Sequence, residues 1–217
     1  MQFLSDFDLN GILADDMGLG KTLQTLSHIQ VHIEKEKKVK REEPLGPCLI
    51  VAPTSVVSNW IKEAAHFTPN LNITEYYGLN RKSINIKKYD VVVTSYGVLR
   101  QDAEMFAQSN LHFIILDEAQ AIKNPSSKTA TAAKEIPAMH KLCLTGTPIE
   151  NHLGELWSMF DFLMPGFLGS ARRFNKNFRK PIETGGDADQ AKRLQARIAP
   201  FILRRTKDVV APHTTAK

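Results

Sequence analysis

The sequence of 217 residues has only two cysteines and two tryptophans. Cys48 and Cys143 are far apart and each lies in a short apolar segment, so we expect reduced core residues and neither a disulfide nor a metal pair. No stretch approaches the roughly 20 apolar residues that span a bilayer, and the N-terminus lacks a basic-then-apolar signal. These absences favour a protein of the cytosol, the nucleoid or the nucleus, without a membrane partner.

Charge and length leave several protein classes open. The 28 lysines and arginines outnumber the 23 acidic residues, which gives a net charge of +5. A basic excess of this size is compatible with nucleic-acid binding, but many enzymes share it. The length suffices for one domain with a proper core, or for one domain with an appendage.

Several short segments have the composition of buried strands. They are continuously apolar, which is typical of a parallel sheet covered on both faces. The segments are residues 10–15, 47–53, 89–96, 112–118 and 141–148. Helical patterns follow some of them: residues 55–67 can begin with a serine cap, and one apolar stripe can form beyond residue 150. That stripe comprises Leu153, Leu156, Trp157, Phe160, Leu163 and Met164. The alternation predicts an α/β fold with a mostly parallel sheet flanked by helices.

Two segments differ from this pattern. Residues 34–46 form a charge run, which we interpret as the frayed end of a helix followed by a solvated loop. From Pro165 onward the strands stop, and basic helical patterns surround a Gly-Gly loop. We therefore predict a sheet domain over residues 1–164 and a helical appendage over residues 165–217.

The segment ILADDMGLGKTLQTL, residues 12–26, places two glycines and a lysine between a strand and a helix. The backbone N–H groups of such a turn, with the positive end of the helix dipole, can bind a polyphosphate. Lys21 would supply a charge for the β and γ phosphates and Thr22 a hydroxyl for Mg²⁺. The usual pattern G-x-x-x-x-G-K-[ST] is incomplete, because Asp15 stands at the first glycine. A purely structural turn therefore remains the alternative.

Two further strand ends carry polar residues. Asp117 and Glu118 end an apolar strand, where neighbouring side chains point in different directions. Asp117 can then hold Mg²⁺ while Glu118 orients and deprotonates the attacking water, although a pair of surface acids capping a helix is the alternative. Thr145, Gly146 and Thr147 follow a third strand. They would place hydroxyls beside the γ phosphate, unless they form a plain turn.

Together these motifs resemble a known family. GILADDMGLGKT, VAPTSVVSNW, VVTSYGVL, ILDEAQAIKNPSS, LTGTPIEN and FILRRTK occur in the order typical of the Swi/Snf family of DNA-translocating ATPases, within helicase superfamily two. The resemblance covers almost the whole chain, and in that family an aspartate in the place of Asp15 is ordinary. It implies an N-terminal RecA-like P-loop lobe that uses ATP and Mg²⁺ to move along double-stranded DNA and remodel protein–DNA complexes.

The resemblance also implies roles for individual residues. ATP binding is implied for Asp15, Asp16, Met17, Gly18, Leu19, Gly20, Lys21 and Thr22, and contact with the metal for Thr22 and Asp117. Hydrolysis is implied for Lys21, Asp117, Glu118 and the γ-phosphate sensor Gln120, and coupling to DNA for Thr145, Gly146 and Thr147. DNA contacts are implied for Pro53, Thr54, Ser58, Asn59, Thr94, Ser95, Tyr96, Lys123 and Asn124. Trp60 lies in one of these motifs, but we interpret it as a core anchor of its helix.

Members of the family have two RecA-like lobes with ATP between them, and arginines of the second lobe complete the site. We expect this chain to be the first lobe of a larger motor, with residues 165–217 as a helical protrusion and the start of the linker. Arg204 and Arg205 lie in that linker-like tail. Because an arginine finger is worth about a thousandfold or more in turnover, we expect this chain alone to hydrolyse ATP slowly.

Two other functions stay open: a strand-separating DNA or RNA helicase, and a nucleotide-dependent interaction module that is not an enzyme. The DEAQ and TGTPIEN motifs argue against the helicase, and the intact phosphate-loop and acidic residues argue against the module. His28 and His32, four residues apart on a helix, could face a metal. The glutamate of H-E-x-x-H is missing, so a solvated helix face is the expectation.

Overall fold

The apolar segments predicted as strands all join one sheet. The computed structural model describes residues 10–38, 46–146 and 152–206, and the structural statements below refer to them. The sheet has seven strands, every pairing is parallel, and the order is β3-β4-β2-β5-β6-β1-β7. The strands are β1 (Gly11–Leu13), β2 (Cys48–Ala52), β3 (Ile73–Glu75), β4 (Val91–Ser95), β5 (Leu111–Leu116), β6 (Ala138–Leu144) and β7 (Ile202–Leu203). The predicted α/β fold is confirmed, and β3 and β7 add to the predicted strands.

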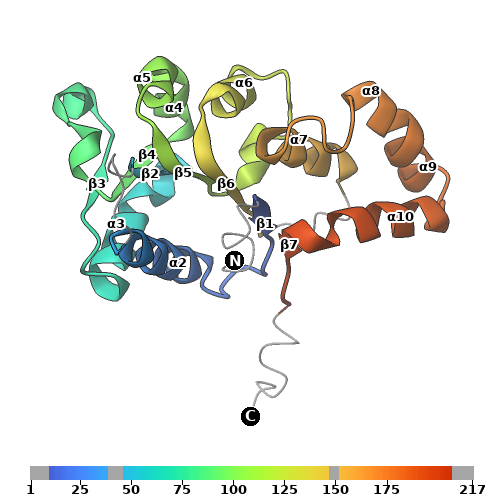
Figure 1. Ribbon diagram of the computed structural model, residues 1–217. Helices are drawn as coiled ribbons and strands as arrows, with labels where there is room; N and C mark the ends of the chain where they lie inside the picture. Colours follow the sequence, from blue (N-terminus) through green and yellow to red (C-terminus); the bar gives the residue numbers. More distant parts are fainter. Residues whose placement is uncertain (1–9, 39–45, 147–151, 207–217) are drawn as a thin grey trace, which may run out of the picture.

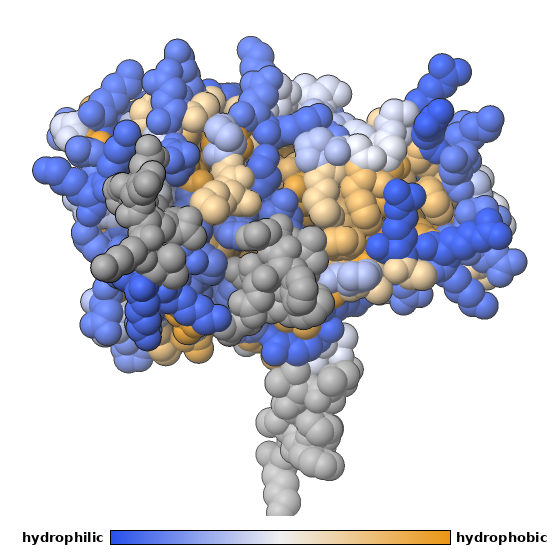
Figure 2. All heavy atoms as spheres, viewed as in Figure 1, coloured by the Kyte–Doolittle hydropathy of each residue, from blue (hydrophilic) through white to orange (hydrophobic). Residues whose placement is uncertain are grey.

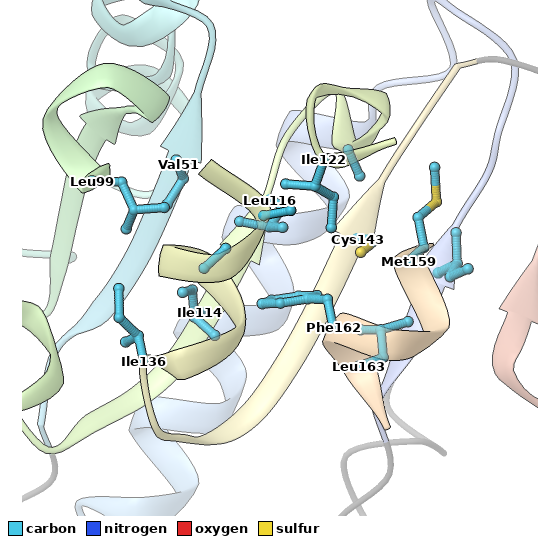
Figure 3. Packing of buried hydrophobic residues seen from close by; sticks show 14 of the residues in the cluster. Val51, Leu99, Ile114, Leu116, Ile122, Ile136, Cys143, Met159, Phe162 and Leu163 are labelled. Atoms are coloured by element: carbon cyan, nitrogen blue, oxygen red, sulfur yellow. The ribbon is translucent and has the colours of Figure 1, made fainter. Parts of the chain in front are cut away.

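Helices cover both faces of the sheet, which explains why its strands are apolar on both sides (Figure 1). In β2, Cys48, Ile50 and Ala52 pack into one apolar layer, and Leu49 and Val51 into the other. The first layer includes α2 (Lys21–Glu36) and α3 (Val57–Phe67). The second includes α4 (Tyr96–Gln101), α5 (Ala103–Ala107), α6 (Lys128–Glu135) and α7 (Leu153–Leu163). Figure 3 shows the second layer, where side chains of β5 and β6 meet those of α7. Each fully buried aliphatic or aromatic side chain in these layers contributes about 1.5–3 kcal/mol.

The helices agree with the sequence patterns in extent but not in every detail. The stripe predicted on α7 is confirmed, because Leu153, Leu156, Phe160 and Leu163 are buried and Trp157 and Met164 are half-buried. The predicted serine cap of α3 is wrong. The 3-10 turn η1 (Thr54–Val56) contains Ser55, and α3 begins after it at Val57 without a side-chain cap. The charge run begins at the end of α2 as expected, and its residues 39–45 lie outside the described part of the chain.

The segment after α7 is helical and projects beside the sheet (Figure 1). It contains α8 (Ala171–Phe174), the π-helix η6 (Asn175–Arg179), α9 (Lys180–Glu183), α10 (Ala188–Ile198) and the 3-10 turn η7 (Ala199–Phe201). A cavity of about 480 Å³ lies between α7, α9 and α10. Figure 2 shows hydrophobic side chains gathered on this side of the molecule. This part corresponds to the predicted helical appendage.

After this appendage the chain returns to the sheet. In β7, Ile202 lies opposite Ile12 and Leu203 opposite Leu13 of β1. The backbone N–H of Ala14 also donates to the carbonyl of Leu203 at 2.8 Å. A domain boundary after residue 164 leaves these residues outside the sheet domain, whereas the structure adds them to the sheet as its edge strand beside β1. Two residues are too few for a strand pattern to be recognised in the sequence, so this pairing was accessible only from the fold.

The predictions about the cysteines and about membrane spans can be compared with the structure. Cys48 and Cys143 are buried and free, as predicted. Burial raises the pKa of both thiols, so the two cysteines behave as small apolar core residues. None of the described helices combines the length and the apolar character that a membrane crossing requires.

The solvated helix face predicted for His28 and His32 is wrong. The His32 ring centroid lies 4.7 Å from that of His112 and 5.2 Å from that of Phe113, both in β5. The His28 ring also packs edge-on against Phe113, at 5.9 Å. Both histidines belong to the side of α2 that covers the sheet, because their rings contact Phe113 of β5.

Candidate nucleotide site

The loop between β1 and α2, residues 14–20, is shaped by two glycines. Gly18 and Gly20 have φ angles of +89° and +72°, a left-handed conformation that costs glycine little. Met17 is exposed and Leu19 half-buried. Gly20 directly precedes α2, and no side chain caps this helix. Its first backbone N–H groups therefore point toward the loop together with the positive end of the helix dipole. This is the geometry that binds a polyphosphate.

Lys21, the first residue of α2, turns its side chain back over this loop. Its Nζ donates hydrogen bonds to the carbonyl oxygens of Asp15 and Asp16, at 2.7 and 3.3 Å. Phosphate oxygens would compete with these carbonyls for the same ammonium group. Gly146, which follows β6, faces this group as well, since a Cβ there would lie 3.5 Å from the Lys21 Nζ. Thr22 is half-buried on the first turn of α2. The fold thus brings the predicted phosphate-binding residues together.

Asp15, which replaces the first glycine of the usual phosphate-loop pattern, has a structural partner. Its buried carboxylate accepts hydrogen bonds from the Arg205 backbone N–H at 2.9 Å, from the Arg205 guanidinium at 2.5 Å and from Gln24 at 3.2 Å. Burial by itself raises the pKa of Asp15, but the hydrogen bonds from Arg205 and Gln24 and the charge of Arg205 outweigh it and lower that pKa. The sequence places Arg205 in a linker-like tail. The structure instead ties it to the phosphate loop, where the N–H of Asp16 donates to its carbonyl at 3.1 Å.

The acidic pair follows β5, on the other side of β6 from the phosphate loop. The Oδ2 of Asp117 accepts a hydrogen bond from Trp60 Nε1 at 2.9 Å, and the Tyr96 hydroxyl donates to the Asp117 carbonyl at 2.7 Å. Burial raises the pKa of the Asp117 carboxyl, the Trp60 hydrogen bond opposes this, and the charge of Glu118 adds to it. Glu118 has a φ of +49°, which is uncommon for a residue other than glycine. This turn gives the two acids different partners.

A line of hydrogen bonds joins Glu118 to the end of β6. Gln120 Nε2 donates to Glu118 Oε2 at 2.7 Å, and the Thr145 hydroxyl donates to Gln120 Oε1 at 3.4 Å. Thr145 is fully buried, and its backbone N–H donates to the Leu13 carbonyl at 3.0 Å. A change at Glu118 can therefore reach the end of β6, beside the phosphate loop, through two hydrogen bonds. Thr147, predicted to act with Thr145, lies outside the described residues.

Most residues with an implied DNA contact lie on the surface, at the same edge of the sheet. Exposed are Thr54, Ser58, Asn59, Lys123 and Asn124, and Pro53 is half-buried. The first group follows β2 and the second follows the 3-10 turn η4 (Ala119–Ile122) after β5, and these two strands are neighbours. Small hydroxyls, amides and one cation suit contacts to a phosphate backbone. Their role stays a prediction.

Three other residues with an implied DNA contact have partners inside the fold. Thr94 is fully buried and its hydroxyl donates to the Tyr76 carbonyl at 2.8 Å. Ser95 is buried and caps α4 by accepting a hydrogen bond from the Val98 N–H at 3.3 Å. Tyr96 is half-buried and braces Asp117 through its hydroxyl. In this conformation the three side chains make hydrogen bonds within the fold at the sheet edge, and their contact with DNA stays a prediction.

Two contacts of the site escaped the sequence reasoning. Trp60 is fully buried, as predicted for a core anchor, but its indole N–H also holds the carboxylate of Asp117. Arg205 holds Asp15 from a position far along the chain. Buried indole groups need an acceptor, so Trp60 could have been matched with a nearby strand-end acid. No sequence signal pairs Arg205 with Asp15, because 190 positions separate them.

A glycine-rich loop between a strand and a helix, with an acidic pair ending a strand two places away, defines a P-loop nucleotide-binding domain of RecA-like fold. More specifically, the chain belongs to the SNF2-related domain family, which matches residues 2–217.

The chain is similar to two solved structures of proteins from Sulfolobus solfataricus. The SWI2/SNF2 ATPase core in complex with dsDNA is 42% identical, with a TM-score of 0.87 over 95% of this chain and 42% of that chain. The SWI2/SNF2 ATPase core domain is 40% identical, with a TM-score of 0.83 over 97% of this chain and 42% of that chain. The TATA-binding protein-associated factor MOT1 of Saccharomyces cerevisiae is 40% identical over 97% of this chain and 12% of its own length. The chain thus spans less than half of each of these relatives.

Proposed function

We propose that this chain is the ATP-binding first lobe of a motor that hydrolyses ATP in response to double-stranded DNA, moves along it and remodels protein–DNA complexes. The observation that carries the proposal is the line from Glu118 through Gln120 to Thr145, which ends beside the phosphate loop and Lys21. Such a line connects a hydrolytic acid with a strand end that can respond to the γ phosphate. Membership in the SNF2-related family supports the same reaction.

ATP and Mg²⁺ fit the residues that the site provides. The two left-handed glycines and the uncapped start of α2 leave backbone N–H groups for the phosphates, and Lys21 adds a charge. Thr22 and Asp117 are the oxygen donors that would hold Mg²⁺, which neutralises charge on the phosphates. Burial disfavours the ionised form of Asp117, so a divalent cation beside it would offset a cost that the folded protein carries.

Within this site the chain's own side chains have separate tasks. Glu118 accepts a proton from the attacking water, and Gln120 holds one oxygen of its carboxylate and so fixes the direction of the other. Trp60 and Tyr96 keep Asp117 in place from neighbouring elements. Thr145 is hydrogen-bonded to Gln120, so a movement of Glu118 and Gln120 during hydrolysis would shift Thr145 and, through it, the DNA-facing edge.

Double-stranded DNA would lie along the carboxyl edge of β2 and β5. Thr54, Ser58, Asn59, Lys123 and Asn124 are exposed there, and contacts of this type are independent of sequence. The solved Sulfolobus relative in complex with dsDNA supports this partner. A second RecA-like lobe of the parent protein would supply arginines to the phosphates. Among the described residues, Arg205 lies at the phosphate loop, but its guanidinium is bound to the Asp15 carboxylate. We therefore expect the isolated lobe to turn over ATP slowly.

Steady-state ATP hydrolysis by the parent protein tests this function. The rate is measured without nucleic acid, with duplex DNA and with RNA, for the natural sequence and for Glu118→Gln. Duplex DNA should stimulate turnover, and Glu118→Gln should lower it about 10²–10⁴-fold because the general base is lost. Glu104→Gln, an exposed glutamate on α5, is the matched control and should leave the rate unchanged.

The other outcomes distinguish the alternatives. Stimulation by RNA alone would replace the translocase with an RNA-directed helicase. Absence of turnover under all conditions, with ATP binding retained, would favour a nucleotide-dependent interaction module. Equal rates in Glu118→Gln and the natural protein would remove Glu118 from the reaction.

A further inference from the structure

Three histidines from distant parts of the sequence meet on the face of the sheet covered by α2. His32 comes from the second half of α2, His112 from β5 and His140 from β6. Their ligand nitrogens all lie within 4.8 Å of one another. His32 follows Lys21 by eleven residues, which is about 16 Å along a helix of 1.5 Å rise per residue. The cluster is therefore separate from the nucleotide site, at the opposite end of the strands.

The arrangement of the three rings matches what a single tetrahedral metal requires. The ring centroids are 4.7 Å apart for His32 and His112, 5.5 Å for His32 and His140, and 5.3 Å for His112 and His140. Three imidazoles bound to one zinc at about 2.0–2.1 Å have ring centres about 5 Å apart. The nitrogens would lie about 3.3 Å apart in such a site, so a bound ion would draw them together from their present spacing, which is within 4.8 Å.

The three imidazoles lie in largely buried, aromatic surroundings. His112 is 1% exposed and His140 4% exposed. The Phe113 ring packs against all three histidines, at 5.2 Å from His32, 4.9 Å from His112 and 4.7 Å from His140. A set of three imidazole nitrogens has affinity for zinc and its neighbours in the first transition row.

An acidic residue lies one helical turn from His32. Glu36 lies four residues after His32, so helical spacing places it on the same side of α2, and it is half-buried. A divalent cation held by three neutral histidines keeps its double charge, and a nearby carboxylate or a bound water can complete a tetrahedral set.

We propose that His32, His112 and His140 bind one zinc ion, which fastens α2 to β5 and β6 at the end of the sheet remote from the phosphate loop. The ion has a structural role there, because the two strand histidines are almost fully buried, as the ligands of a structural site are. This site does not depend on the proposed ATPase function and is tested without nucleotide.

Metal titration of the purified protein, first stripped with a chelator, tests the proposal. Co²⁺ should give the absorption of a tetrahedral site, and Zn²⁺ should displace it at one ion per chain. Zinc at about a hundredfold excess over its Kd should raise the Tm by about 5–10 °C. His32→Gln should lower the affinity at least about 100-fold, since one of three ligands is lost. This variant is chosen because His32 is half-buried on a helix and its replacement should leave the fold intact.

His66→Gln, an exposed histidine on α3, is the matched control and should bind as the natural sequence does. Far-UV circular dichroism and the metal-free Tm show whether each variant is folded. Absence of tetrahedral cobalt absorption in the natural protein would overturn the proposal without any variant. Undiminished zinc binding by folded His32→Gln would overturn it as well.

Discussion

The two ends of the parallel sheet carry different kinds of site. At the carboxyl end, Lys21 and Glu118 belong to contiguous motifs that directly follow strands, and hydrogen bonds fix their side chains. At the other end, His32, His112 and His140 belong to no contiguous motif and meet only by packing. The difference teaches that chemistry at strand ends can be located from local sequence. A cluster inside a packed layer depends on how distant segments are brought together.

A second contrast lies within the nucleotide site, between its two buried aspartates. Arg205 and Gln24 outweigh burial at Asp15, and the pKa of that carboxyl is lowered. At Asp117 burial dominates over the hydrogen bond from Trp60, and the pKa is raised. Asp15 is thus a stable, permanently charged anchor of the loop. Asp117 carries an ionised form that the fold disfavours, which suits a group whose partner is a bound cation.

Of the three substitutions at Arg205, Trp60 and Lys123, removal of Arg205, the partner of Asp15, should change stability the most. Arg205→Met should lower the free energy of unfolding by about 2 kcal/mol, because a fully buried carboxylate loses its counter-charge. This loss of unfolding free energy is smaller than that expected for an entirely buried ion pair, because the Arg205 side chain is 41% exposed. Urea unfolding at pH 7 measures it. Arg179→Met, which breaks the more exposed pair with Glu183, is the control and should cost less than about 0.5 kcal/mol.

The pH dependence of this loss has a definite sign. A carboxyl whose pKa is lowered by folding stabilises the folded state above its unfolded pKa, which is about 3.9 for aspartate. That stabilisation disappears as the pH falls through the lower pKa of the folded state. Because the unfolded chains titrate alike, the difference between Arg205→Met and the natural sequence should shrink as the pH falls through the pKa of Asp15 in the folded variant, which burial without the guanidinium raises. It should level off below the lowered pKa of the natural protein. A loss as small as that of Arg179→Met would mean that Asp15 does not depend on Arg205.

Removal of the hydrogen bond from Trp60 to Asp117 should have a smaller effect on stability and should raise the pKa of Asp117 further above that of Asp15. Trp60→Phe keeps most of the buried ring but removes the N–H donor, and we expect a loss of about 1.5 kcal/mol in unfolding free energy. Because the Trp60 hydrogen bond lowers the pKa of Asp117, its removal should raise that pKa further. The acid limb of the pH–rate profile of ATP hydrolysis by the parent protein should then move to higher pH.

Trp157→Phe is the matched control for this change. The Trp157 indole donates to the Gly169 carbonyl at 3.0 Å, far along the chain from the acidic pair, so a similar hydrogen bond is lost without a change at Asp117. Its pH–rate profile should match that of the natural protein. A profile that is the same in both variants would show that Trp60 acts only as a core residue.

The smallest expected effect is on DNA binding by Lys123, an exposed residue at the carboxyl edge of the sheet. Lys123→Ala should weaken binding of duplex DNA by the parent protein a few-fold. It should also lower the slope of affinity against salt by about one counterion, because one phosphate contact is lost. Fluorescence anisotropy over a range of salt concentrations measures both. Lys134→Ala removes a lysine paired with Asp161 and should leave the slope unchanged; an equal change in the two variants would argue against a specific contact at Lys123.

The sequence by itself determined the parallel α/β fold, the phosphate loop and the acidic pair. Each is encoded within a few neighbouring residues: continuously apolar strands, the glycines before Lys21, and two acids directly after β5. In a parallel sheet all carboxyl ends share one edge, so local order along the chain was enough to place these groups in one site. The interpretation of Trp60 as a core anchor of its helix was also correct.

Tertiary structure alone decided which partners these groups have. The pairing of β7 with β1, the ion pair of Asp15 with Arg205 and the bond from Trp60 to Asp117 each join segments that are distant in sequence. It also turned Thr94 inward, and gathered three histidines that no local pattern connects. The physical reason is that periodicity and motifs record which way a chain segment faces. The burial, hydrogen bonds and charges that set its chemistry come from whatever the fold packs against it.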